Sequence, residues 1–101
     1  MGVLLVIEAV RPLFPMGELV ATPGAMALLE KRRLSPAKFL TRHVSGDWGD
    51  LCLEDQELNR EALKQGLRLM SSYTIGSSGE TIWIITEADR SSTTILTPEE
   101  Y

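Results

Sequence analysis

The chain has 101 residues, of which 44% are hydrophobic and 24% are charged, the ordinary composition of one folded soluble domain. Ten Lys and Arg against fourteen Asp and Glu give a net charge of -4, so we do not expect it to bind nucleic acid through bulk positive charge. The length excludes a complete kinase, dehydrogenase or nucleotide-dependent methyltransferase core. None of their glycine-rich motifs is present, and we expect no cofactor.

The numbers of cysteines and histidines exclude two further kinds of site. Cys52 is the one cysteine, which excludes an internal disulfide and, beside a single histidine, a Cys/His zinc site. This usage fits a reducing compartment, and we expect a cytoplasmic protein that does not bind a membrane. The apolar residues 3–7 are too few to span a bilayer, and no signal-peptide cleavage site follows them. We treat residues 1–12 as an N-terminal extension or edge strand and residues 13–101 as a single α+β domain.

The first third of that domain predicts one strand and two helices. Residues 13–22 form an irregular strand, because Pro15 within it indicates an edge position or a bulge. The Thr-Pro pair at 22–23 and the Ser-Pro pair at 35–36 each combine a helix cap with a proline at the first helical position. The two helices that begin there are expected to end near residues 33 and 44.

A third helix is predicted from about residue 54 to residue 64. Leu58 and Ala62 lie one turn apart, so we expect both to face inward, and Gly66 is placed to end the helix. Between the second and third helices lies a glycine-flanked acidic loop, residues 46–50.

The last third changes to the alternating pattern of strands. Residues 67–75, 81–86 and 92–97 are predicted strands joined by short turns, and the middle one is apolar on both faces, as is typical of a central strand. These strands should form an antiparallel meander. We therefore expect an α+β fold, with an antiparallel sheet of three to four strands and about three helices packed on one face.

The acidic loop and the preceding helix supply one candidate site. His43 with Asp47 and Asp50 has the residue types of a general base oriented by a carboxylate, or of a divalent-metal site. Alternatively, His43 interacts with the last carbonyls of its helix and the aspartates bond to backbone amides in the turn. Trp48 either folds onto the core or contacts a binding partner. The spacing matches no catalytic motif, so no residue is assigned as catalytic and no metal ligand is assigned.

Two further groups are candidates for binding. Glu87, Asp89 and Arg90 lie in the loop between two strands and could pair with charges of a partner protein, or simply form a solvated connection. Tyr73 and Trp83 lie on neighbouring strands. If both rings face outward, with Arg68 nearby, they would form a platform for RNA bases. If they face the helices, they belong to the core.

Five strings together resemble a family of small bacterial proteins that are often found near mobile DNA: residues 13–17 (LFPMG), 20–25 (VATPGA), 42–51 (RHVSGDWGDL), 83–91 (WIITEADRS) and 94–101 (TILTPEEY). Members of that family are labelled hypothetical, plasmid-related or type I restriction modification subunit. Adenine methylation needs a cofactor-binding α/β domain and an Asn/Asp-Pro-Pro-aromatic motif, and this sequence contains neither.

We expect a small accessory or interaction protein rather than an enzyme, one that modulates a host defence or replication complex for a mobile element. A metal-assisted hydrolase or nuclease using His43, Asp47 and Asp50 is the alternative, and an RNA-binding module is the second alternative. A protein partner is expected. An uncovered sheet face or the apolar residues 3–7 could also pair with a second copy, which predicts a possible homodimer.

Overall fold

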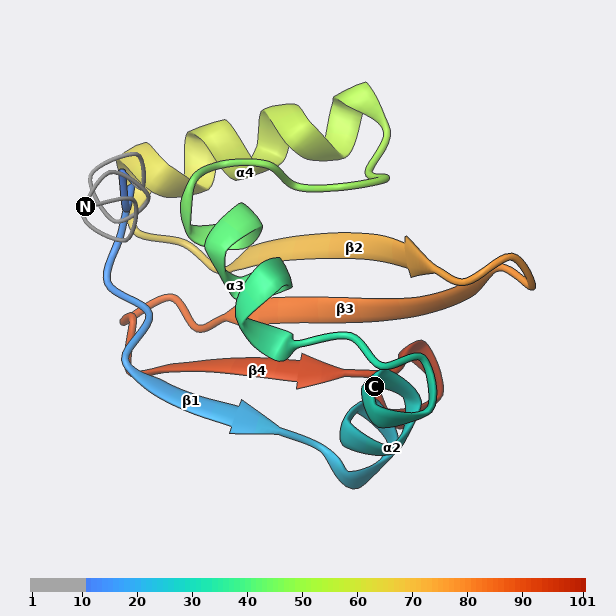
Figure 1. Ribbon diagram of the computed structural model, residues 1–101. Coiled ribbons are helices and arrows are strands. Elements are labelled where there is room, and N and C mark those ends of the chain that lie inside the picture. Colours follow the sequence, from blue (N-terminus) through green and yellow to red (C-terminus); the bar gives the residue numbers. More distant parts are fainter. Residues whose placement is uncertain (1–10) are drawn as a thin grey trace, which may run out of the picture.

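The computed structural model describes residues 11–101, and the apolar segment at residues 3–7 lies outside them. In the described part, four strands, three α-helices and a short 3-10 helix follow one another along the chain (Figure 1). They are β1 (Glu18–Ala21), α2 (Pro23–Lys31), α3 (Pro36–Val44), α4 (Leu53–Gln65), β2 (Leu69–Ile75), β3 (Glu80–Thr86), β4 (Ser92–Leu96) and η1 (Pro98–Glu100). The α+β class is confirmed. None of these helices is long and apolar enough to cross a membrane.

The sheet has the order β1-β4-β3-β2 and is mixed rather than purely antiparallel. Strands β2, β3 and β4 form the predicted antiparallel meander, whereas β1 pairs with β4 in parallel. The prediction of an antiparallel sheet is therefore corrected for β1. All three helices and two strands separate β1 from β4 along the chain, so no hairpin turn dictates an antiparallel direction.

The helix starts follow the local signals in the sequence. The side-chain oxygens of Thr22 and Ser35 each accept a hydrogen bond of 3.2 Å from a backbone N–H in the first turn of α2 and α3. Helix α3 has the predicted bounds, α2 ends two residues before residue 33, and Gly66 ends α4 in the left-handed conformation at φ 68°.

Strand β1 is shorter than the predicted residues 13–22. Gly17, directly before it, has a φ of 66°, and a Cβ there would lie 2.4 Å from the carbonyl oxygen of Arg90. Extended pairing therefore begins only at Glu18, and residues 13–17 follow an irregular path beside α3.

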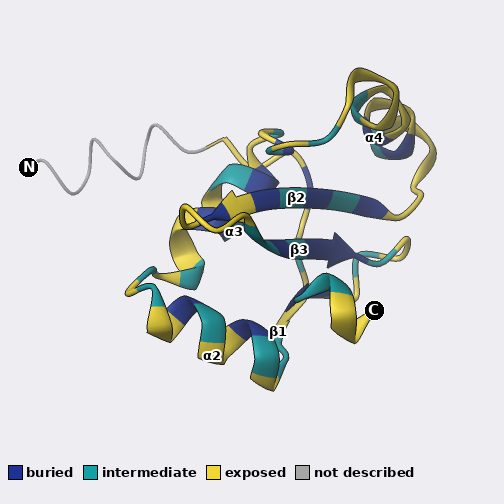
Figure 2. Ribbon diagram, turned by 90° about the vertical axis from the view of Figure 1, so that its right-hand side faces the viewer, coloured by how far each residue is buried: buried dark blue, intermediate teal, exposed yellow. Residues whose placement is uncertain are grey.

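Helices α2 and α3 cover one face of the sheet, as Figure 2 shows. The main core lies between them and the strands, and its buried members are Ala25, Leu29, Phe39, Tyr73, Ile75, Ile82, Ile84 and Ile95. Central strand β3 is buried on both faces, as predicted: Ile82 and Ile84 face the helices and Ile85 faces the other side.

Helix α4 lies along the edge strand β2 instead of joining the other two helices on that face. Ala62 is buried as predicted, but Leu58 is 64% exposed, so the prediction that it faces inward is wrong. Asn59 takes the inward position, because the helix meets the backbone of the edge strand and an amide can bond to it.

The C-terminal residues fold back over the second face of the sheet. The Tyr101 ring contacts Trp83 edge to face, with ring centroids 5.5 Å apart. The Glu100 carboxylate accepts hydrogen bonds from the Thr22 hydroxyl at 2.5 Å and from Gly24 N–H at 3.0 Å. The hydrogen bond from Thr22 lowers the pKa of Glu100 to about 2, so its charge stays at the start of α2.

Candidate functional site

His43 belongs to a series of hydrogen bonds that runs across the sheet and is buried from Ser71 to Thr93. Its Nδ1 is 2.6 Å from the Ser71 hydroxyl on β2, and its Nε2 is 2.9 Å from the Thr86 hydroxyl on β3. Thr86 continues to Thr93 on β4 at 2.7 Å, and Thr93 donates to the Met16 carbonyl at 2.7 Å. The series thus joins α3, three strands and the segment before β1.

The last acceptor fixes the direction of the hydrogen bonds from Thr93 back to His43 Nε2. Because Thr93 donates its one proton to the Met16 carbonyl, it must accept from Thr86, which in turn must accept from Nε2–H of His43. In the neutral form of the ring, Nδ1 carries no proton and accepts from the Ser71 hydroxyl. No buried side-chain polar atom in residues 11–101 lacks a partner, which is the arrangement of a structural network.

Burial sets the charge state of His43. The side chain is 0% exposed, and the rings of Phe14 and Trp48 pack against it edge to face at centroid distances of 5.3 Å and 5.7 Å. Desolvation lowers the pKa of His43 to about 4, so the ring is neutral at pH 7.

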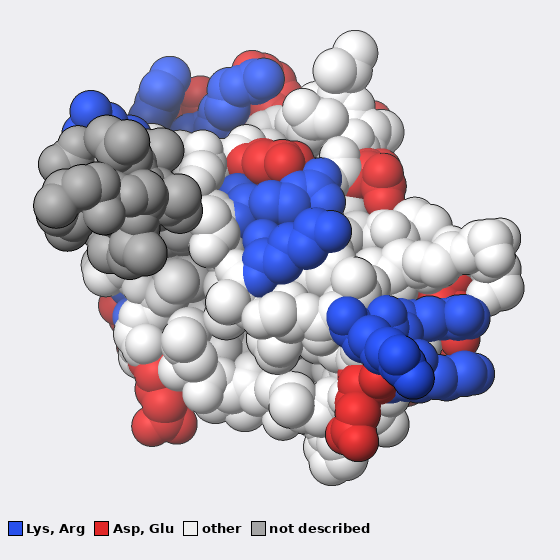
Figure 3. All heavy atoms as spheres, viewed as in Figure 1, with Lys and Arg blue, Asp and Glu red and all other residues white. Residues whose placement is uncertain are grey.

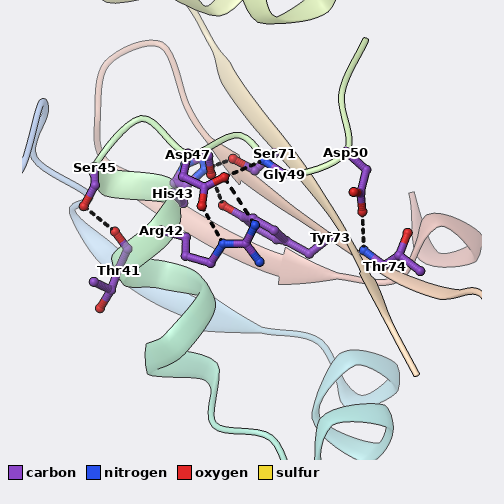
Figure 4. A network of polar contacts seen from close by, with 10 residues as sticks. All are labelled: Thr41, Arg42, His43, Ser45, Asp47, Gly49, Asp50, Ser71, Tyr73 and Thr74. Atoms are coloured by element: carbon purple, nitrogen blue, oxygen red, sulfur yellow. Dashed lines mark hydrogen bonds and ion pairs between the residues drawn. The ribbon is translucent and has the colours of Figure 1, made fainter. Parts of the chain in front are cut away.

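Asp47 and Asp50 are directed to other partners (Figure 4). Asp47 pairs with Arg42 at 2.7 Å, a hydrogen bond that lowers its pKa, and also accepts from Gly49 N–H at 3.1 Å. Asp50 accepts from the Thr74 backbone N–H at 2.6 Å.

The structure therefore does not bring these two carboxylates to His43. Among the residues it describes, no cluster of three His, Cys, Asp or Glu side chains could hold a metal ion. The hydrolase or nuclease alternative required His43 exposed in a cleft with the carboxylates converging on it, and that geometry is not present in this region.

Trp48, a predicted binding residue, lies inside the molecule. It is 6% exposed, its ring stacks on Phe14 at a centroid distance of 6.3 Å, and its carbonyl accepts from Ser72 N–H at 3.1 Å. The interpretation of Trp48 as a side chain folded onto the core matches this position. A partner could reach it only by displacing part of the core.

The loop after β3 has one partly buried cation, Arg90, and two acids at the surface, Glu87 and Asp89. Arg90, at φ 62°, donates to the carbonyls of Leu67 at 2.6 Å and Ala62 at 3.2 Å, so it ties the end of α4 to this loop. Asp89 is exposed and accepts from a backbone N–H within the loop, and Glu87 pairs with Arg68 at 3.4 Å. Arg90 is thus committed to the fold, and Asp89 and Glu87 lie at the surface.

Tyr73 and Trp83 lie on opposite faces of the sheet. Tyr73 is opposite Ile82 in the register and faces the helices, whereas Trp83 is opposite Ser72 and faces the other side. Tyr73 is 1% exposed, its hydroxyl donates to the Asp47 carbonyl at 2.7 Å, and desolvation raises its pKa to about 12. The two rings therefore do not form the shared platform that the RNA-binding alternative required.

One edge of the sheet is closed by the molecule itself. On the outer side of β2, the Asn59 side chain donates to the Met70 carbonyl at 2.7 Å and accepts from Met70 N–H at 3.2 Å. Ser72 pairs with the loop through the Trp48 carbonyl at 3.1 Å and Asp50 N–H at 2.7 Å. An edge sealed in this way cannot add another strand.

The opposite edge, β1, is open in the part of the chain that the structure describes. Glu18 N–H bonds to Ser91 and Thr22 N–H to Ile95, so residues 18, 20 and 22 turn their backbone groups to β4. The N–H and C=O groups of Leu19 and Ala21 consequently point away from the sheet. No hydrogen bond from residues 11–101 reaches them.

An apolar groove of about 470 Å³ lies between β1, the segment before it and α3. It is lined by Pro12, Phe14, Pro15, Met16, Leu19, Ala37, Leu40, Thr41 and Val44. On the face shown in Figure 3, a white, uncharged area lies between acidic side chains at the lower left and groups of Lys and Arg side chains at the centre and right. Among residues 11–101 no charged side chain lines the groove, so an apolar ligand could enter it without removing a charge from water.

Sequence reasoning did not single out this groove. One local feature of the sequence points to it, the adjacent apolar residues Leu19 and Val20. Successive strand residues point to opposite faces, so this short edge strand carries an apolar side chain on each face. Leu19 is 54% exposed and Val20 is 39% exposed. The groove itself arises only when residues 12–16 pack beside α3. Comparison of the chain with family models, curated proteins and solved structures finds no match.

Proposed function

We propose that this protein is a small accessory protein that acts by binding another polypeptide along strand β1. The bound segment adds to the sheet as a further strand and places apolar side chains in the neighbouring groove. The observation that carries the proposal is the outward-facing backbone of Leu19 and Ala21, directly beside 470 Å³ of apolar groove.

Strand addition divides binding into two contributions. Backbone hydrogen bonds to Leu19 and Ala21 supply affinity that depends little on the partner's sequence. Every second side chain of the added strand points to the groove side, and the uncharged lining selects apolar residues there. The partner is therefore an extended segment with alternating apolar residues.

The cellular setting of this binding is part of the proposal. The resemblance of the sequence to proteins found near mobile DNA supports a role in modulating a host defence or replication complex for such an element. The single Cys52 supports action in the cytoplasm. In this setting the protein acts by binding a segment of its partner, and it catalyses no reaction.

Photo-crosslinking tests the proposal. A photoreactive amino acid at position 20, beside the open edge, should capture a polypeptide in cells or lysate. The same group at position 60, on the exposed side of α4, should not. The Leu19→Pro substitution removes one outward N–H without touching the bonds to β4, and we expect it to reduce capture at least tenfold. The Leu19→Ala variant keeps that N–H and separates loss of the backbone group from loss of the side chain.

Two results would contradict the proposal. Equal adducts at positions 20 and 60 would show that capture is not specific to the edge. Undiminished capture in the Leu19→Pro variant would show that the β1 backbone takes no part in binding.

A further inference from the structure

We propose that, in the isolated protein, the polypeptide on β1 is β1 of a second copy, in antiparallel pairing about a two-fold axis at Val20. The pairing would join the sheets of both copies into one continuous sheet. This inference rests on the proposed function, since it names the partner for the same edge.

The positions of the outward backbone groups select this register. In antiparallel strands, two directly opposed residues can exchange both of their N–H···O=C bonds. A two-fold axis at Val20 places Leu19 of each copy opposite Ala21 of the other. All outward N–H and C=O groups of β1 then have partners, and none is left unpaired.

The neighbouring registers are excluded by the residues that flank β1. An axis at Leu19 would oppose Ala21 with Gly17, whose φ of 66° is not extended. An axis at Ala21 would oppose Leu19 with Pro23, which has no N–H to donate. An axis between two residues would oppose side chains on different faces of the sheet.

The same register matches the two faces of the sheet. Directly opposed residues point to the same face, and Leu19 and Ala21 both face the helix side, as their pairing with Thr93 and Ile95 shows. The two grooves therefore meet across the axis, with Leu19 of each copy beside Ala21 of the other. Val20 meets Val20 of the second copy on the opposite face.

Charge also permits this pairing. The one charged residue of β1, Glu18, is opposite Thr22 of the second copy, so the two carboxylates do not face each other. Strand β1 itself carries none of the lysines or prolines with which proteins commonly protect an exposed edge. The apolar side chains of Leu19 and Val20 are exposed in a single copy, and the pairing would cover part of them.

A disulfide on the two-fold axis tests the arrangement. In a Cys52→Ser background, the Val20→Cys variant should form an intermolecular disulfide on mild oxidation. A non-hydrogen-bonded antiparallel pair has Cα atoms about 4.5 Å apart, within the range a disulfide requires. Glu18→Cys is the matched control, on the same strand and face. Its Cα atoms would lie roughly 14 Å apart, four residues at about 3.4 Å each, and should stay reduced.

Light scattering of the unmodified protein completes the test, with twice the mass of one chain as the expected result. A monomer at high concentration, or equal cross-linking of the two cysteine variants, would overturn the dimer.

Two other occupants of the β1 edge would also overturn the dimer. One is a foreign protein captured at position 20 by a monomeric chain, which leaves the proposed function standing. The other is the chain's own N-terminal segment, shown by an intrachain disulfide between Leu5→Cys and Val20→Cys. A monomer with no capture at position 20 would remove both proposals.

Discussion

The two edges of the sheet are treated in opposite ways. At β2, Asn59, Trp48 and Asp50 satisfy the outward backbone groups with side chains and a loop. At β1, the corresponding groups of Leu19 and Ala21 have no partner in residues 11–101, and an apolar groove lies beside them. Within residues 11–101, the fold thus closes the β2 edge with its own groups and leaves backbone groups of the β1 edge unpaired, and we propose that these unpaired groups serve binding.

The buried hydrogen bonds of His43 connect these two regions. They begin at Ser71 on the sealed strand β2 and end at the Met16 carbonyl, two residues before β1. Met16 also lines the groove. The segment that lines the groove is therefore held by the interior of the molecule. We expect substitutions in the interior to lower stability, and substitutions on the exposed side of β1 to affect the proposed binding with little effect on the stability of the monomer.

The largest loss of stability is expected from a substitution at Trp48, beside the closed β2 edge. Its ring is 6% exposed and packs against Phe14, so the Trp48→Ala variant should lose about 3–5 kcal/mol of free energy of unfolding. Urea denaturation measures this loss. The exposed Arg60→Ala variant serves as the control and should change by less than about 0.5 kcal/mol. Unchanged stability with a loss of partner binding would instead make Trp48 a contact residue.

Acidification should lower the free energy of unfolding, because it favours protonation of His43, whose hydrogen bonds run between the two edges of the sheet. The folded state lowers the pKa of His43 from 6.5 to about 4, so the unfolded chain binds a proton more readily between these values. The free energy of unfolding should be independent of His43 above pH 6.5 and fall by about 3 kcal/mol as the pH drops to 4. Thermal melts between pH 7 and pH 5 measure the slope above the range where carboxylates titrate. The His43→Gln variant, less stable at pH 7, should show a flatter profile, and a flat profile in the unmodified protein would contradict the assignment.

A smaller effect is expected from opening the sealed edge itself. The Asn59→Leu variant leaves Met70 N–H and C=O without their partners and should lose about 2 kcal/mol. Amide hydrogen exchange at Met70 should accelerate more than exchange at Ile84 in the core. Leu58→Ala, at the exposed neighbouring position, is the control. Equal protection of Met70 in the two variants would show that the amide does not seal this edge.

The smallest effect on stability is expected at β1. Leu19 is 54% exposed, so the Leu19→Lys variant should change the monomer's free energy of unfolding by less than about 0.5 kcal/mol. It should nevertheless abolish capture at position 20, because a charge would enter the groove and repel added strands. A loss above about 1 kcal/mol would show that Leu19 supports the fold itself.

Local signals in the sequence predicted most of the elements. The Thr-Pro and Ser-Pro pairs placed the starts of α2 and α3, and alternation placed β2, β3 and β4 to within two residues at either end. Gly66 ends its helix as predicted. Each of these signals acts between residues close in sequence, through a cap, a fixed φ or a periodic apolar face, and so can be read without the fold.

Local sequence signals predicted less of the candidate site. Sequence proximity suggested that His43 works with Asp47, whereas its ring nitrogens bond to Ser71 and Thr86, 28 and 43 residues away. Apolar character placed Leu58 inward, but the edge-strand backbone required the amide of Asn59 there. Bonds between such distant residues leave no local pattern.

The sequence by itself thus determined the α+β class, the helix starts and the antiparallel meander, because these depend on local backbone preferences and periodicity. The tertiary structure decided the direction of β1, the burial of His43 and Trp48, and which edge of the sheet is closed. Those features depend on contacts between residues far apart in the sequence, both of side chains and of backbone groups, which form only after the chain has folded. Within residues 11–101, the strand backbone groups of Leu19 and Ala21 are left without hydrogen-bond partners, beside the groove.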